Sequence, residues 1–233
     1  MKSKLRYFSP FEWGLILLSY AAILSTFLIF DRANYFNLFS SLIGIAALIF
    51  SAKGNPFGPL LMILFSLGYG AISFSFSYYG EMITYLGMSL PMSVWAFAAW
   101  FKNPYGKGHS VVKVSAVRGK EWYLIALLTL AVTALFYFVL GALETPNLIP
   151  STFSVSTSFA ASYLTARRSP LFALAYALND VVLIVLWTLA TLEDISYLSV
   201  TVCFIVFLVN DLYSFFNWCR MAKKQKNSPE NAN

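Results

Sequence analysis

Two asparagine–aspartate pairs lie inside long apolar stretches of this sequence, where polar groups are costly. Asn179 and Asp180 lie near the middle of the stretch Leu171–Leu192, and the same dipeptide recurs as Asn210-Asp211. Polar and ionisable side chains at membrane depth usually face a bundle interior or a water-filled cavity, and they often mark a transport pathway. We therefore expect these pairs to bind a small polar ligand. For Asp180, a structural role held by hydroxyls of a neighbouring helix is the alternative.

Aromatic residues share the helical face of the first pair. Tyr176 precedes Asp180 by four residues and Trp187 follows it by seven, so a carboxylate and aromatic rings converge on one side of a helix. In the second pair, Asn210 is the expected ligand contact. Asp211 either serves the same site or reaches the membrane interface and pairs with a loop cation.

The stretch Pro150–Ala166 is too rich in hydroxyl residues to face lipid on all sides. Five of them follow one helical face at steps of three and four residues, so this stripe is expected either to line a pathway or to allow close helix packing. The residues of the stripe are Ser151, Ser154, Ser158, Ser162 and Thr165.

Further irregular positions occur earlier in the chain. Pro91 cannot donate a backbone hydrogen bond to Gly87, which predicts a kink suited to a gating helix, although proline is also common in ordinary membrane helices. Trp95 and Trp100 are candidates for stacking on a ligand. Trp100, at the end of its apolar stretch, fits an interfacial aromatic belt better. Gly68-Tyr69-Gly70 is interpreted as a point of close helix packing.

Motifs for catalysis or for a resident metal or cofactor are missing from the sequence. His109 is the only histidine, and Cys203 and Cys219 have neither the spacing of a metal site nor that of a disulfide framework. The formal charge of +6 lies in loops with few aromatics, which argues against nucleic-acid binding and suits anionic membrane lipid. We therefore expect no enzyme, no cofactor and no metal.

Composition identifies the class of protein. Of 233 residues, 59% are hydrophobic and 11% charged, and the mean hydropathy is +0.69. Apolar stretches of about 20 residues, enough to cross a hydrocarbon core of roughly 30 Å, recur along the chain. Eight such spans are predicted: 11–30, 36–52, 57–79, 82–101, 122–142, 150–166, 171–192 and 195–218.

The loop charges support this count. Of the 16 basic residues, 15 fall on one side of the predicted spans, and only Arg32 falls on the other, where Asp31, Glu81, Glu144 and Glu193 also lie. Because basic loops stay in the cytoplasm, we expect a bacterial cell membrane protein with both termini cytoplasmic and its acidic turns external. The first span is expected to be retained rather than cleaved.

An internal repeat organises the spans. Ser51–Pro56 resembles Thr165–Pro170 at an offset of 114 residues, and Glu81–Leu86 resembles Glu193–Leu198 at an offset of 112. Three spans are therefore predicted to repeat in parallel around one linking span. The expected fold is a single all-α integral membrane domain over 1–233. Its parts are an accessory helix (11–30), a first three-helix repeat (36–101), a linker helix (122–142), a second three-helix repeat (150–218) and a cytoplasmic tail (219–233).

This plan resembles the PnuC family of bacterial vitamin transporters, over roughly 36–220. The resemblance rests on the repeat plan and on the segments Gly80–Pro104, Ala177–Trp187 and Phe207–Trp218. It implies a core of seven helices like that of SWEET sugar transporters and a homotrimer. It also implies uptake of nicotinamide riboside by facilitated diffusion, with trapping by a cytoplasmic kinase.

The same resemblance assigns site residues. Asn179 and Asn210 fall on polar positions of the family's central cavity, and Trp95 and Trp100 match a tryptophan pair roughly. A second tryptophan pair of the family, before the asparagine of span seven, is missing, so stacking would come from Tyr176 or Trp187. The vitamin therefore stays open between a pyridine nucleoside and another vitamin such as thiamine or riboflavin. A membrane enzyme or a sensor subunit is the alternative from a different class.

Overall fold

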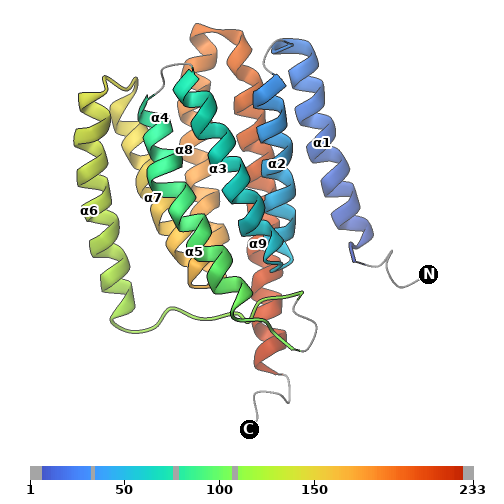
Figure 1. Cartoon of the computed structure of the whole chain (residues 1–233). Helices are drawn as coiled ribbons and strands as arrows, with labels where there is room; N and C mark the ends of the chain where they lie inside the picture. Colours follow the sequence, from blue (N-terminus) through green and yellow to red (C-terminus); the bar gives the residue numbers. More distant parts are fainter. Residues whose placement is uncertain (1–6, 33–34, 76–78, 107–109, 228–233) are drawn as a thin grey trace.

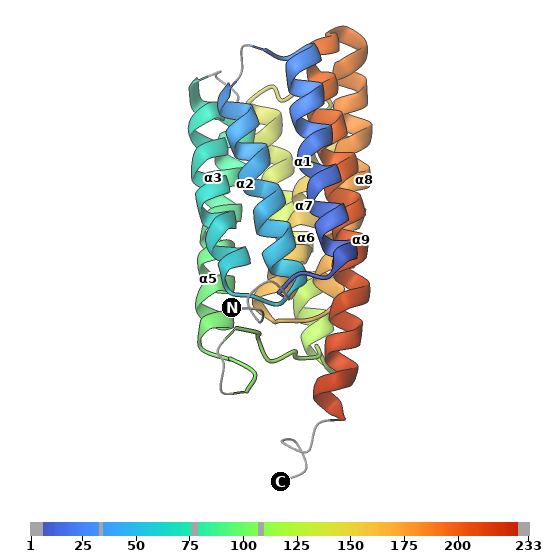
Figure 2. The same cartoon turned by 90° about the vertical axis from the view of Figure 1, so that its right-hand side faces the viewer.

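The computed structural model describes residues 7–32, 35–75, 79–106 and 110–227 and shows an all-helical protein. The helices run side by side in one bundle, with the N-terminal helix along its edge (Figures 1 and 2). They are α1 (Pro10–Phe30), α2 (Tyr35–Ala52), α3 (Phe57–Ser75), α4 (Tyr79–Ile83), α5 (Leu90–Phe101), α6 (Glu121–Ala142), α7 (Leu148–Ala166), α8 (Leu171–Glu193) and α9 (Leu198–Lys226), with a π-helical turn η2 (Thr84–Ser89) and a 3-10 turn η3 (Ile195–Tyr197).

Length and composition allow five of the described helical stretches to cross a membrane. These are α1, α2, α6, α8 and the stretch of η3 and α9 from Ile195 to Lys226. The other predicted spans correspond to α3, to α4 with η2 and α5, and to α7, which lie alongside the long apolar helices (Figure 1). The predicted all-helical membrane protein is confirmed at this level.

Two turns at the basic end of the bundle have the same geometry, 114 residues apart. In Ser51–Pro56 and Thr165–Pro170 the chain leaves its helix through a residue with positive φ, Gly54 at 65° and Arg168 at 60°. The next residue then donates its backbone N–H to the carbonyl five positions earlier, at 3.0 Å in both turns. This arrangement is the Schellman motif, which usually takes glycine at the left-handed position. The resemblance between the two segments therefore extends from sequence to backbone.

The helix containing Pro91 is irregular, as its sequence predicts. Upstream of the proline, Thr84–Ser89 winds as a π-helical turn, and the Leu90 N–H donates to the carbonyl of Tyr85. Such turns are often found at functional sites because they widen the helix and redirect its side chains. Here Tyr85 and Ser89 point into the cavity described below.

The chain between α5 and α6 ties the two turns together. The backbone N–H of Val112 donates to the Gly54 carbonyl at 2.8 Å, and that of Ser115 donates to the Arg168 carbonyl at 3.0 Å. Val112 is fully buried. These hydrogen bonds hold the described part of this loop across both turns.

Helix α9 is longer than its predicted span, which ends at Trp218. The residues 219–226, predicted as part of a cytoplasmic tail, are helical. The reason is Gln225, whose side chain accepts from the Val114 N–H at 2.8 Å and donates to the Val112 carbonyl at 3.0 Å. These contacts hold the extended helix against the loop.

The accessory helix α1 is held to the bundle through Glu12. Ser9 and Glu12 form a capping box that starts the helix. The Glu12 carboxylate also pairs with Lys53 Nζ at 2.9 Å and accepts from the Tyr213 hydroxyl at 2.7 Å. One buried carboxylate thereby joins α1 to α9 and to the turn after α2.

Candidate functional site

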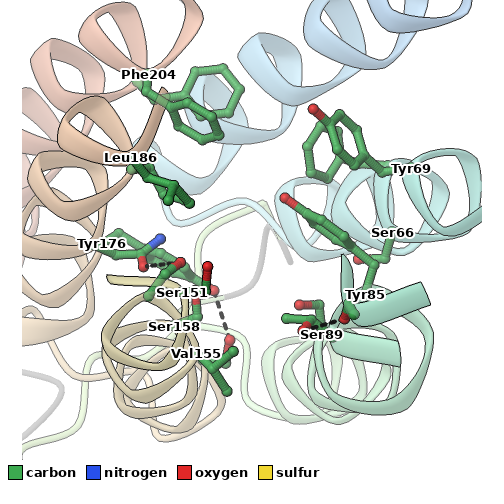
Figure 3. Close-up of a pocket in the computed structure, with 18 of the residues that line it drawn as sticks. Ser66, Tyr69, Tyr85, Ser89, Ser151, Val155, Ser158, Tyr176, Leu186 and Phe204 are labelled. Carbon is green, nitrogen blue, oxygen red and sulfur yellow. Dashed lines mark hydrogen bonds between the residues drawn. The ribbon is translucent and has the colours of Figure 1, made fainter. Parts of the chain in front are cut away.

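A cavity of about 510 Å³ lies within the bundle. Residues of α3, η2 and α5 line one side of it, and residues of α7, α8 and α9 line the other (Figure 3). Its volume falls in the range of about 300–1,000 Å³ that is usual for small-molecule sites. The cavity extends to Glu144 and Glu193 at the acidic end, and at the basic end it stops at Ser51, Thr165 and Phe172.

The hydroxyl stripe of α7 forms a polar wall. All five residues of the predicted stripe line the cavity, although close helix packing was an equal alternative. The stripe gives this wall a series of hydroxyl groups that can donate and accept hydrogen bonds.

Asn179 on α8 stands beside this wall, with its amide oriented by α7. Its Oδ1 accepts hydrogen bonds from Ser154 Oγ at 3.2 Å and from Thr157 Oγ1 at 2.8 Å. Asn179 lines the cavity. Because two hydroxyls occupy the oxygen, the amide N–H₂ is the group that can donate to a ligand.

The opposite wall carries aromatic rings. Tyr69 on α3 and Tyr85 in η2 lie with ring centroids 4.7 Å apart, and both face the cavity (Figure 3). On the polar side, the Tyr176 hydroxyl is 2.9 Å from Ser162 Oγ, and Trp187 packs on a tyrosine near the acidic end. Flat rings on one side and hydroxyls on the other suit a ligand with an aromatic part and a polyhydroxyl part.

Two aspartates meet where α8 contacts α9. Asp180 is 4% exposed and Asp211 is 2% exposed, and their carboxyl groups are close neighbours. Asp211 lines the cavity and Asp180 does not. Asp211 is therefore the member of the pair that can contact a ligand in the cavity.

Carboxyl groups line the cavity without any basic side chain beside them. They belong to Glu144, Glu193 and Asp211, and no lysine or arginine of the described chain belongs to the lining. No group of three or more His, Cys, Asp or Glu side chains in the described residues could hold a metal ion. The cavity thus offers hydrogen bonds, aromatic surface and negative charge.

Three of the seven residues predicted to bind substrate line the cavity, namely Tyr176, Asn179 and Trp187. Asn210, expected in the central cavity, instead faces the accessory helix. Its amide donates to Ser19 Oγ on α1 at 3.0 Å and to the Val206 carbonyl at 2.8 Å. Adjacent helical residues point about 100° apart, so Asp211 takes the cavity position and Asn210 the outer one. For Asp180 the correction is similar, because contact with Asp211 places it behind the wall.

The other two predicted tryptophans, Trp95 and Trp100, lie outside the cavity. Trp95 is 42% exposed and packs edge-on against Tyr163. Trp100 is fully buried, and its indole N–H donates to the Thr165 carbonyl at 2.7 Å. Its assignment to an interfacial belt is therefore wrong, because a partner for its only polar atom lies inside the bundle.

Ser66, Tyr69 and Tyr85 also line the cavity, although the sequence did not predict them there. Ser66 is fully buried on the cavity wall, and its hydroxyl has no hydrogen-bond partner among the described residues. Tyr69 stands between two glycines, a pattern that predicts close helix packing instead. The usable signal was Pro91, because the irregular helix that it predicts contains Tyr85 within its π-helical turn.

Comparison with known proteins assigns this chain to a family. The family model described as nicotinamide mononucleotide transporter matches residues 34–220, which excludes α1. A solved structure described as the crystal structure of the vitamin B3 transporter PnuC superimposes with a TM-score of 0.79. It is 22% identical in sequence, and the match covers 94% of both chains, so the two share a fold.

Two curated relatives are similar along most of their length. The nicotinamide riboside transporter PnuC of Neisseria mucosa is 25% identical over 213 residues, which cover 89% of this chain and 81% of the relative. That of Haemophilus influenzae is 23% identical over 193 residues, covering 82% of each. With four-fifths of its length matched by one family model, this chain belongs to the nicotinamide mononucleotide transporter family and is a multi-pass membrane transporter rather than an enzyme.

Proposed function

We propose that this transporter takes up nicotinamide riboside, or a closely related pyridine nucleoside, through the cavity between α3, η2 and α5 on one side and α7, α8 and α9 on the other. The observation that carries this proposal is the division of the cavity into an aromatic wall and a hydroxyl and amide wall. A nucleoside has the same two parts, a flat base and a ribose with several hydroxyls. The relatives named as nicotinamide riboside transporters support the same substrate.

The family description names the mononucleotide, whereas the relatives are named for the riboside, and the charges favour the riboside. A mononucleotide adds a phosphate, which proteins usually bind with arginine, lysine or a helix N-terminus. The described lining of the cavity contains three acidic residues and no lysine or arginine. Nicotinamide riboside carries a positive pyridinium ring instead. The acidic lining attracts that ring and repels a phosphate.

In the proposed complex the base stacks on Tyr69 and Tyr85, and the ribose lies against α7 and α8. The amide nitrogen of Asn179 donates to a ribose hydroxyl, and the serine stripe supplies further partners. Tyr176 and Trp187 border the site. Compared with the residues predicted from sequence, Asp211 replaces Asp180 as the aspartate that borders the ligand.

We further propose the complete arrangement of eight spans. It consists of the accessory helix 11–30, a first repeat over 36–101, a linker helix over 122–142 and a second repeat over 150–218 in a single domain. The two equivalent Schellman turns support the parallel repeat. By the positive-inside rule, the basic end and both termini lie in the cytoplasm of a bacterial cell.

The family resemblance supports three more proposals about the working transporter. Transport is facilitated diffusion, a cytoplasmic kinase traps the vitamin by phosphorylation, and the protein assembles as a homotrimer in the membrane. The loop charges favour anionic lipid at the cytoplasmic face.

The substrate is tested by uptake of labelled nicotinamide riboside into proteoliposomes that contain the purified protein. Excess unlabelled riboside should abolish the uptake, whereas nicotinamide mononucleotide, thiamine and riboflavin should not compete at the same concentration. Protein-free liposomes are the control for leakage. Preferred competition by thiamine or riboflavin would assign another vitamin to the cavity, and competition by the mononucleotide would refute the charge argument.

A further inference from the structure

Two tryptophans at the basic end connect the two proposed repeats in a symmetric way. Trp100 at the end of α5 donates its indole N–H to the Thr165 carbonyl of α7 at 2.7 Å. Trp218 of α9 donates its indole N–H to the Ser51 carbonyl of α2 at 2.8 Å. Ser51 and Thr165 are the equivalent residues of the two Schellman turns, 114 positions apart. Each tryptophan thus reaches from its own repeat to the same position of the other one.

The two indoles also pack on each other. Both residues are fully buried, and their ring centroids are 5.1 Å apart. Phe172 packs edge-on against Trp218 at 4.9 Å and lies 6.2 Å from Trp100. The three rings form a continuous apolar plug between the repeats.

This plug lies at the inner limit of the cavity. Ser51, Thr165 and Phe172 line the cavity, whereas Trp100 and Trp218 lie directly behind them and do not. Beyond the rings, the loop that carries Val112 joins the carbonyls of the two turns. A ligand in the cavity therefore meets Phe172 first, then the tryptophans, then the loop. At the acidic end the cavity continues up to the loop residues 143–147.

We propose that Trp100 and Trp218 form the inner gate of the transporter, a latch that must separate before the ligand leaves on the basic side. Both hydrogen bonds link one repeat to the other, so relative movement of the repeats breaks them together. Each broken bond leaves a buried indole N–H and a buried carbonyl without a partner until water enters, and this favours the closed state. The latch opens as a unit because the two indoles that donate these bonds pack on each other. This inference rests on the proposed repeats and on the cytoplasmic location of the basic end.

A cysteine reporter inside the cavity tests the latch without any substrate, so the result is separate from the identity of the vitamin. Ser158 lines the middle of the cavity (Figure 3). Ser158→Cys is introduced together with Cys219→Ser, because Cys219 is exposed and Cys203 is buried. A membrane-impermeant charged thiol reagent is then applied from the basic side in inside-out vesicles and from the acidic side in right-side-out vesicles.

Trp100→Phe and Trp218→Phe keep an aromatic ring but remove the indole donor. Each should raise the labelling rate from the basic side by roughly five- to tenfold, as expected for one buried hydrogen bond lost from the closed state. Trp122→Phe is the matched control, because Trp122 is a half-exposed residue of α6 outside the plug. It should leave the rate unchanged. Gln225→Ala, which releases the loop without touching the rings, should give a smaller increase.

Labelling from the acidic side in every variant shows that the cavity is folded. A purely structural role for the tryptophans would lower the melting temperature without increasing labelling from the basic side, and that result would overturn the gate. An equal increase in Trp122→Phe would overturn it as well. If the tryptophan variants fail to fold, an unchanged rate in Gln225→Ala refutes the closed inner end.

Discussion

The role of Asn179 gives the most direct test of the proposed site, through the substitution Asn179→Ala. In the structure its Oδ1 is occupied by Ser154 and Thr157, so the group removed from the ligand is the amide N–H₂. A ribose hydroxyl left without its partner in a buried site costs about 2 kcal/mol. The dissociation constant for nicotinamide riboside should therefore rise roughly 30-fold.

The fold should tolerate this change. The Thr157 hydroxyl already lies 2.9 Å from the Phe153 carbonyl and 3.1 Å from that of Ser154, so it keeps partners when the amide is lost. We expect a loss of about 1 kcal/mol in the free energy of unfolding, typical of one neutral hydrogen bond. Binding is measured by isothermal titration calorimetry on the purified protein, with thermal unfolding recorded on the same sample.

Asn210→Ala is the matched control. It removes the same side chain from the second asparagine–aspartate pair, where the amide binds Ser19 of α1 and the Val206 carbonyl rather than the cavity. This variant should lose a similar amount of stability while its dissociation constant stays within about twofold of the parent. Equal weakening in the two variants would refute the assignment of Asn179 to the cavity and Asn210 to the accessory helix.

Three further outcomes are expected. Asp211→Ala should weaken binding of nicotinamide riboside about fivefold in the same calorimetric assay, the effect of one polar partner lost from the cavity wall. Arg168→Gly should stabilise the protein by about 1 kcal/mol in thermal unfolding, because arginine holds a left-handed backbone there, whereas Gly54→Ala at the equivalent turn should destabilise it by a similar amount. Glu12→Gln should reduce stability by about 2 kcal/mol and make α1 more sensitive to protease, since its partner Lys53 is only partly exposed; unchanged proteolysis would show that α1 is held by apolar contacts alone.

Much of the helical architecture could be predicted from the sequence, because a membrane restricts the structures that a spanning chain can adopt. Apolar length locates the helices, and the described helix α8 begins at the predicted residue, Leu171, and ends one residue after the predicted Leu192. The hydroxyl stripe of α7 was found by its helical period alone. These signals are local, so they do not depend on how helices from distant parts of the chain meet.

The direction of the polar pairs was not predictable in the same way. Asn179-Asp180 and Asn210-Asp211 have the same letters, yet the first turns its asparagine to the cavity and the second its aspartate. The choice depends on how α9 is rotated, and α1 packs on the outer face of α9. A dipeptide repeat therefore indicates where polarity occurs but not which member of each pair faces the ligand.

The two walls of the cavity come from different repeats, and this has a consequence for transport. Tyr69 and Tyr85 belong to the first proposed repeat, whereas Asn179 and the serine stripe belong to the second. A nucleoside that contacts both walls binds most tightly when the repeats are close together, so its binding free energy favours the closed arrangement. Release then requires the repeats to separate at one end. Because the tryptophan plug joins the repeats at the basic end, its separation is the step that lets the ligand pass inward.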